Sequence, residues 1–326
     1  MILASPVIAL ISLSWSTLTA VYKVLHRVGL RKSVKLPLRV ISVGNFEVGG
    51  TGKTPVVAEI AREAVQRGLQ PLILSRGYRG RWERQGGVIS PHSGADTLDP
   101  GDTGDEPSLL HELCPHAWIG VGADRLESFE RVMQLSRTLG ARMPDLVILD
   151  DGLQHLEIAR ELDVILATSN RPWTKIFREF PVSSRKTRSV FAWTKGYQPP
   201  FGIGADASVV RLRWQMAPPA RAGGSDKLWL VTGVADGRQV RDSLEAAGWA
   251  IEAFSYLEDH AKYSREWVKA KITRAKQSGL KIATTGKDWV KWRALGIQRD
   301  EVLVFEPEIV WDDQGRKLWL RELWGE

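Results

Sequence analysis

A glycine-rich turn between an apolar segment and a lysine–threonine pair constrains this chain more than any other feature. Residues 40–44 (Val-Ile-Ser-Val-Gly) are mostly small or β-branched and predict a buried strand. The run Gly-Gly-Thr-Gly-Lys-Thr follows at 49–54, and Pro55 suits the first turn of a helix, where a backbone N–H is not needed. A strand, a glycine-rich loop and a helix in this order are typical of a phosphate-binding loop, or P-loop.

Each residue of this loop has a chemical role toward a nucleotide. The predicted nucleotide-binding residues are Gly49, Gly50, Thr51, Gly52, Lys53 and Thr54. Glycines let successive backbone N–H groups converge on phosphate oxygens. We expect Lys53 to reach the β- and γ-phosphates of ATP and the Thr54 hydroxyl to bind Mg²⁺. Glu47 stands where the strict pattern has glycine, and Gly44 can supply the turn instead.

A second apolar segment, residues 144–151, ends in two carboxylates, Asp150 and Asp151. In P-loop proteins a strand of this kind supplies a carboxylate on the Mg²⁺ side of the nucleotide. The predicted metal ligands are therefore Thr54 with Asp150 or Asp151, and the sequence does not decide between the two carboxylates.

Strands and helices alternate along the chain, which predicts an α/β fold with a P-loop-type parallel sheet. A helix at 56–67 and a strand at 71–75 complete the first strand–helix–strand unit, while residues 83–107, rich in Gly, Asp, Ser and Pro, predict a long functional loop. Further strands are expected at 117–121, 163–167, 227–232, 251–256, 281–285 and 302–305, and further helices at 238–247 and 264–278.

Composition divides the chain into three predicted parts. Stretches rich in Gly, Pro and Ala at 197–206 and 217–225 bracket a domain boundary. The parts are an N-terminal helix with a basic linker (1–36), a P-loop domain (37–222), and a smaller α/β domain (223–326) whose C-terminal segment could pack back on the P-loop domain.

The first 22 residues carry no charged side chain. This uncharged stretch is close in length to the roughly 20 residues that cross a bilayer. Basic residues follow at Lys23, Arg27, Arg31, Lys32, Lys35 and Arg39. We favour a helix that lies in or dips into the inner leaflet of a membrane, with its basic end at the lipid headgroups. A core helix of the domain and a true membrane span stay open as alternatives.

The charge of the chain favours anionic partners without pointing to nucleic acid. The net charge is +7, but the basic residues form no block of five. We therefore expect a phosphorylated substrate or an anionic lipid surface, no nucleic acid and no obligate protein partner. A single cysteine, Cys114, excludes an internal disulfide.

Several motifs accompany the P-loop in a fixed order. They are Leu74-Ser-Arg-Gly-Tyr78, Gly104-Asp-Glu-Pro107, Val121-Gly-Ala-Asp-Arg125, Ile148-Leu-Asp-Asp-Gly152 with Gln154-His155, and Asp259-His260 with Tyr263. In these motifs, and over nearly its whole length, the chain resembles the tetraacyldisaccharide 4′-kinases, the lipid A 4′-kinases. A generic P-loop protein needs no Ser-Arg-Gly-Tyr or Gly-Asp-Glu-Pro at these places.

The resemblance implies a reaction and the residues that carry it. The γ-phosphoryl group of ATP would be transferred to the 4′-hydroxyl of a lipid A disaccharide precursor, at the cytoplasmic face of the inner membrane, by a peripheral or monotopic enzyme. The resemblance implies that Asp105 accepts the hydroxyl proton, that His260 pairs with it, and that Arg125 stabilises negative charge. Since Asp105 and His260 fall in different predicted domains, we expect the site between the domains.

The chain departs from the family pattern at three places. Glu47 replaces the usual Ser or Thr, Gly286 replaces the usual Glu before Lys-Asp, and the segment 171–181 is short. These departures concern the details of substrate contacts more than the fold.

Two other functional classes are considered. A partitioning-type P-loop ATPase would carry a second lysine just before the glycine pair, where this chain has Val48. A membrane-docked nucleotide-binding module without kinase activity would not need Asp105, Asp150 and His260 alongside the intact loop.

Overall fold

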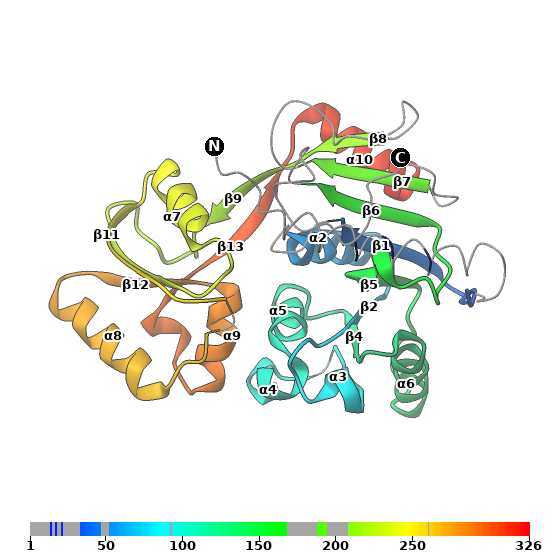
Figure 1. Ribbon diagram of the computed structural model, residues 1–326, viewed down its shortest axis with the longest axis horizontal. Coiled ribbons are helices and arrows are strands. Elements are labelled where there is room, and N and C mark those ends of the chain that lie inside the picture. The colour runs from blue at the N-terminus through cyan, green and yellow to red at the C-terminus, as the bar shows by residue number, and fades with distance from the viewer. Residues whose placement is uncertain are drawn as a thin grey trace.

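The computed structural model describes residues 33–46, 52–91, 93–167, 188–193, 208–259 and 261–326, together with Ser14, Thr17 and Val21. These residues form two α/β units, each built on its own sheet, and strands β9 and β13 run between the units (Figure 1). The predicted fold class, a large P-loop-type parallel sheet with a second α/β unit, is confirmed. The predicted N-terminal membrane helix lies almost entirely outside the described residues.

The larger sheet has eight strands in the order β3-β4-β2-β5-β1-β6-β7-β8. They are β1 (Arg39–Asn45), β2 (Pro71–Ser75), β3 (Gly87–Ile89), β4 (Trp118–Val121), β5 (Leu146–Asp150), β6 (Leu162–Ala167), β7 (Arg188–Trp193) and β8 (Ser208–Arg211). Neighbouring strands are parallel except β3, which is antiparallel to β4 at the edge. The central strand β1 lies between β5 and β6. The phosphate loop therefore leaves the middle of the sheet.

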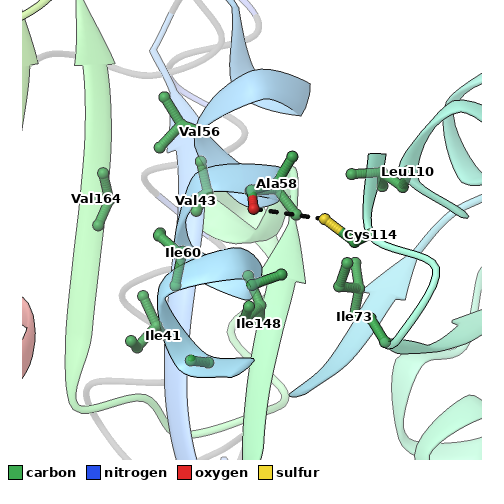
Figure 2. Packing of buried hydrophobic residues seen from close by; sticks show 14 of the residues in the cluster. Ile41, Val43, Val56, Ala58, Ile60, Ile73, Leu110, Cys114, Ile148 and Val164 are labelled. Carbon is green, nitrogen blue, oxygen red and sulfur yellow. Dashed lines mark hydrogen bonds between the residues drawn. The ribbon is translucent and has the colours of Figure 1, made fainter. Parts of the chain in front are cut away.

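Helices cover both faces of this sheet. They are α2 (Lys53–Gln66), α3 (Trp82–Gln85), α4 (Pro100–Thr103), α5 (Asp105–Leu113), α6 (Arg125–Thr138) and α10 (Asp313–Trp324), with short 3₁₀ turns at Ala95–Thr97 and Gly152–Gln154. Successive side chains of a strand point to opposite faces. Ile41 and Val43 of β1 accordingly share a buried cluster with α2, which Figure 2 shows, whereas Val40 belongs to the cluster on the α6 side.

The smaller sheet has five strands in the order β11-β10-β12-β13-β9. They are β9 (Arg213–Ala217), β10 (Lys227–Thr232), β11 (Ala250–Tyr256), β12 (Lys281–Thr285) and β13 (Leu303–Val310), accompanied by α7 (Gly237–Ala246), α8 (Arg265–Gln277), α9 (Gly286–Ala294) and a 3₁₀ turn at Arg299–Glu301. The strands are parallel except β9, which runs antiparallel to β13.

The two units are joined closely in sequence and at the C-terminus. A single residue separates β8 of the larger sheet from β9, which lies within the range 37–222 yet pairs with β13 in the smaller sheet. After β13 the chain returns to the larger unit as α10. There the Trp319 and Trp324 indole N–H groups donate to the buried carboxylate of Glu63 on α2, at 3.0 and 2.6 Å. The last helix is thus fixed to the helix that follows the phosphate loop.

The prediction of one long loop at 83–107 is wrong, because this stretch contains the strand β3 and several short helical turns. Asp99 explains one of them, since its side chain accepts from the Gly101 backbone N–H at 2.8 Å and caps α4. The same Asp, Ser and Gly residues that suggest a loop also begin and end short elements. Within the described part of the chain, no helix combines the length and the hydropathy that crossing a membrane requires.

Candidate active site

The ends of the phosphate loop are described, while Glu47–Thr51 lie outside the described residues. Gly52 has a φ of 80° and caps α2, a left-handed conformation that glycine adopts at little cost. A Cβ at this position would also lie 2.6 Å from the ring of Trp214. Lys53 and Thr54 therefore open α2, where unpaired N–H groups and the helix dipole favour an anion. The roles of Gly49, Gly50 and Thr51 stay predictions.

The two predicted carboxylates lie beside Lys53. Asp150 ends β5 and is paired in register with Val43 of β1. The Lys53 Nζ atom is 3.6 Å from Oδ1 of Asp151 and donates to the Asn45 side-chain oxygen at 3.3 Å. The structure thus brings the lysine at the start of α2 to the carboxyl end of the central strands, the edge where open α/β sheets bind ligands.

Asp150 is buried, with 2% of its surface exposed, and accepts a hydrogen bond from the Ser75 hydroxyl at 2.7 Å. Burial raises the pKa of Asp150, and the Ser75 hydrogen bond opposes this rise. A cation at this carboxylate would offset the cost of its burial. Ser75 is not among the predicted site residues, although it stands in the Ser-Arg-Gly-Tyr motif.

Thr54, Asp150 and Asp151 offer only oxygen ligands, which is the donor type that Mg²⁺ requires. A magnesium ion in nucleotide sites is held by one or two carboxylates together with phosphate oxygens and water. Across the described ranges, no three His, Cys, Asp or Glu side chains gather into a metal site of their own. The residues present fit an ion shared with a nucleotide.

Glu106 belongs to the same group of charges, although it is not among the predicted site residues. Burial, and after it the nearby carboxylate of Asp150, raise the pKa of Glu106 to about 7, against the opposing charges of Lys53 and Lys287. Lys287 belongs to α9, so charges from both units meet here. The signal available in the sequence was the second acidic residue of the Gly-Asp-Glu-Pro motif.

Arg125 opens α6 directly after Asp124, whose side chain caps the helix. Its side chain is 3% exposed, and its guanidinium donates to the Gly122 carbonyl. The Nε and Nη2 atoms have no hydrogen-bond partner among the described residues. Burial lowers the pKa of Arg125 to about 10, and the charge of Asp150 opposes this decrease. A buried guanidinium whose N–H donors are partly unpaired is suited to binding an oxyanion.

Asp105 lies at the start of α5 and faces the smaller unit. Its Oδ2 atom is 3.1 Å from the Lys291 Nζ atom of α9. The predicted partner His260 lies outside the described residues, so their pairing stays a prediction. Asp259, the residue before His260 in the sequence, pairs with Lys287 of α9 at 2.8 Å. The hydroxyl of Tyr263, three residues after His260, lies at the same interface.

The helices α5 and α9 face each other where the two units meet (Figure 1). A second ion pair, between Glu112 of α5 and Arg293 of α9, lies farther along the same helices. Asp105 of the larger unit therefore contacts the smaller unit, as expected for a site between them.

Comparisons with known proteins point to one family. A family model described as tetraacyldisaccharide-1-P 4′-kinase matches residues 4–324. The chain is 33% identical over 309 residues to a tetraacyldisaccharide 4′-kinase from Pelobacter propionicus, covering 89% of this chain and 83% of that protein. It is 29% identical over 323 residues to the enzyme of that name from Syntrophus aciditrophicus, covering 85% of this chain and 84% of that protein.

The fold has a counterpart among solved structures. A crystal structure of LpxK from Aquifex aeolicus in complex with ATP superposes with a TM-score of 0.73 at 24% sequence identity. The match covers 96% of this chain and 97% of that chain. The likeness extends through both α/β units.

Proposed function

Since the chain belongs to the tetraacyldisaccharide-1-phosphate 4′-kinase family and phosphorylates the 4′-hydroxyl of a lipid A disaccharide precursor, we propose that ATP is the donor and that the group of charges between α2, β5, α5 and α9 carries the transfer. The family match extends over 4–324, so it includes both units. Neither a partitioning-type ATPase nor an inactive nucleotide-binding module is favoured.

The donor side of the reaction uses the start of α2. Lys53 neutralises charge on the β- and γ-phosphates, and the loop residues 49–52 supply backbone N–H groups. Phosphoryl transfer depends mainly on positioning and on stabilising the charge of the transferring group. The ion pair of Lys53 with Asp151 supports this role, since it directs the ammonium toward the carboxyl end of β5.

Thr54 and Asp150 or Asp151 would hold Mg²⁺, which when bound supplies further charge neutralisation to the phosphates. The chain's own contribution is to keep the carboxylates in place. Ser75 does so for Asp150 through its hydrogen bond of 2.7 Å. Arg125 contributes a fixed positive charge to the transferring group or to the existing phosphate of the substrate.

The acceptor side of the reaction uses Asp105. As the 4′-oxygen attacks the γ-phosphorus and the bond to the ADP oxygen breaks, the hydroxyl proton moves to the Asp105 carboxylate. His260 orients that carboxylate by hydrogen bonding and shares the charge that develops as the proton is transferred. Asp105 is only 17% exposed in its side chain, which limits competition from water.

The lipid substrate reaches this site from a membrane. We propose that the segment 1–22 and the basic residues after it hold the enzyme at the cytoplasmic face of the inner membrane as a peripheral or monotopic protein. The acyl chains can then stay in the leaflet while the disaccharide enters between the units.

The observation that carries this proposal is the meeting of Lys53, the carboxylates of Asp150 and Asp151 at the end of β5, and the start of α5 at one edge of the sheet. The test is an assay of purified protein in detergent with ATP, Mg²⁺ and a tetraacyldisaccharide 1-phosphate. The proposal requires a 4′-phosphorylated product in stoichiometric amount with ADP. ATP hydrolysis without lipid phosphorylation would instead favour the ATPase alternative.

A further inference from the structure

The smaller unit provides a lysine directly at the proposed proton acceptor. The Lys291 Nζ atom is 3.1 Å from Oδ2 of Asp105, and the two side chains are only 13% and 17% exposed. The same ammonium group is 3.4 Å from the Ala261 carbonyl oxygen. Because little solvent reaches this pair, its electrostatic interaction is screened less than that of a surface ion pair.

The position of Lys291 is fixed from within its own unit. Its ammonium lies 5.9 Å from the centre of the Tyr263 ring, within reach of a cation–π contact. The Tyr263 hydroxyl in turn donates to Oδ1 of Asp288 at 2.7 Å. Burial and the negative charge of Asp288 raise the pKa of the Tyr263 phenol, so the phenol keeps its proton and stays a donor.

Asp288 is the fixed point of this arrangement, since it is fully buried in the first turn of α9. Its Oδ2 atom accepts from three groups at the carboxyl ends of β10 and β12, namely the Thr232 hydroxyl at 2.9 Å, the Gly233 N–H at 3.0 Å and the Thr285 hydroxyl at 3.0 Å. A carboxylate with this many donors is a stable anchor. It ties the start of α9 to Tyr263 and hence to the surroundings of Lys291.

A carboxylate that accepts a proton must be ionised and directed at the hydroxyl when the substrate arrives. We propose that Lys291 is a positioning residue for catalysis: it holds the Asp105 carboxylate in the orientation that receives the hydroxyl proton, so that the smaller unit completes the proton acceptor of the larger one. This inference rests on the proposed role of Asp105.

A competing explanation is that the Lys291–Asp105 pair only holds the two units together. The Glu112–Arg293 pair offers a matched comparison, because it joins the same two helices through residues farther along each of them. If both pairs only hold the two units together, breaking either pair should change the rate of phosphoryl transfer by a similar factor. If Lys291 acts on the base, only its loss would reduce the rate of phosphoryl transfer strongly.

The experiment compares kcat and the KM for ATP in lipid phosphorylation for wild type, Lys291→Met, Lys291→Arg, Asp105→Ala and the double variant Asp105→Ala/Lys291→Met. We expect Lys291→Met to lower kcat by about 10- to 100-fold, a part of the 10²- to 10⁴-fold that general-base catalysis contributes. The KM for ATP should change little. Lys291→Arg keeps the positive charge and should recover most of the rate.

The double variant separates a role through Asp105 from a general structural one. Groups that act as a unit give losses that do not multiply. Lys291→Met should therefore cost nothing further once Asp105 is alanine. Glu112→Gln, and Lys269→Met, which breaks a lysine–carboxylate pair within the smaller unit at 2.8 Å, serve as controls and should keep kcat within about threefold.

Three results would overturn the inference: wild-type kcat in Lys291→Met, a full further loss in the Asp105→Ala background, or an equal loss in Glu112→Gln. Lys291→Gln gives the same comparison if Lys291→Met does not fold. Failure of the proposed role of Asp105 looks different, because Asp105→Ala would then itself keep full activity.

Discussion

The carboxylate of Glu306 on β13 should make the stability of the protein depend on pH in a specific way. Its Oε2 atom is inaccessible to solvent and has no hydrogen-bond partner among the described residues. Burial, and the neighbouring charge of Glu112, raise the pKa of Glu306 from 4.5 to about 8, while Arg299 opposes this rise. The folded protein therefore holds a proton here at pH values at which the unfolded chain has lost it.

The sign of the effect follows from proton binding. Between about pH 4.5 and pH 8 the folded state binds more protons at Glu306 than the unfolded state, so the free energy of unfolding falls as pH rises. The rise of the pKa from 4.5 to about 8 corresponds to a change of roughly 5 kcal/mol in the free energy of unfolding, at 1.36 kcal/mol per pH unit. Because part of the side chain reaches solvent, we expect about half of this, 2–3 kcal/mol.

Glu306→Gln removes the titration while keeping the shape of the side chain. The free energy of unfolding of the variant minus that of wild type should rise by about 2–3 kcal/mol between pH 5 and pH 9. Urea denaturation of both proteins across this range measures the difference and cancels the titrating groups that do not interact with Glu306. A difference that stays constant with pH would refute the reasoning.

Three further predictions concern the loop, the membrane and a departure from the family pattern. Lys53→Ala should lose about 100-fold or more of kcat in the lipid kinase assay with an unchanged unfolding temperature, since phosphate charge is left uncompensated; full activity would remove the P-loop assignment. Deleting residues 1–22 should move the protein to the soluble fraction and weaken activity on lipid more than ATP binding, and unchanged membrane partition would show that another surface docks. Gly286→Ala should reduce the free energy of unfolding by about 1–3 kcal/mol, because the added methyl group would collide with the Glu306 carboxylate. If this collision is the cause, adding Glu306→Ala should partly restore the stability that Gly286→Ala loses. Thermal unfolding of the single and double variants measures this.

The central strands could be predicted because their signal is local. An apolar run bounded by glycine, proline or charge identifies β1, β2 and β12, and β2 begins and ends at the predicted residues, Pro71 and Ser75. A strand buried on both faces is mostly apolar. These elements need no knowledge of their neighbours.

The peripheral strands could not be placed from such local signals. The pairing of β9 with β13 joins Trp214 to Ile309, far apart in the sequence, and the sequence of β9 does not reveal which sheet it enters. The short strand β3 lies in a stretch whose Gly, Asp and Ser residues resemble a loop. Non-local pairing decides both cases.

The candidate site shows the same division. Lys53, Thr54 and the Asp150–Asp151 pair stand in contiguous motifs, so spacing alone was enough to predict that they lie close together. Glu106 and Lys291 acquire their surroundings from the contact of α5 with α9, and no spacing within either helix indicates that contact.

The central claim is that Asp105 accepts the substrate proton with the support of His260. The most direct test is the kcat of lipid phosphorylation in Asp105→Ala, His260→Ala and the double variant, with ATP binding measured alongside. We expect Asp105→Ala to lose about 10²- to 10⁴-fold and His260→Ala somewhat less. The double variant should be no slower than Asp105→Ala, with ATP affinity retained in all three. Losses that multiply in the double variant would contradict the account, and Asp151 would become the leading candidate for the base.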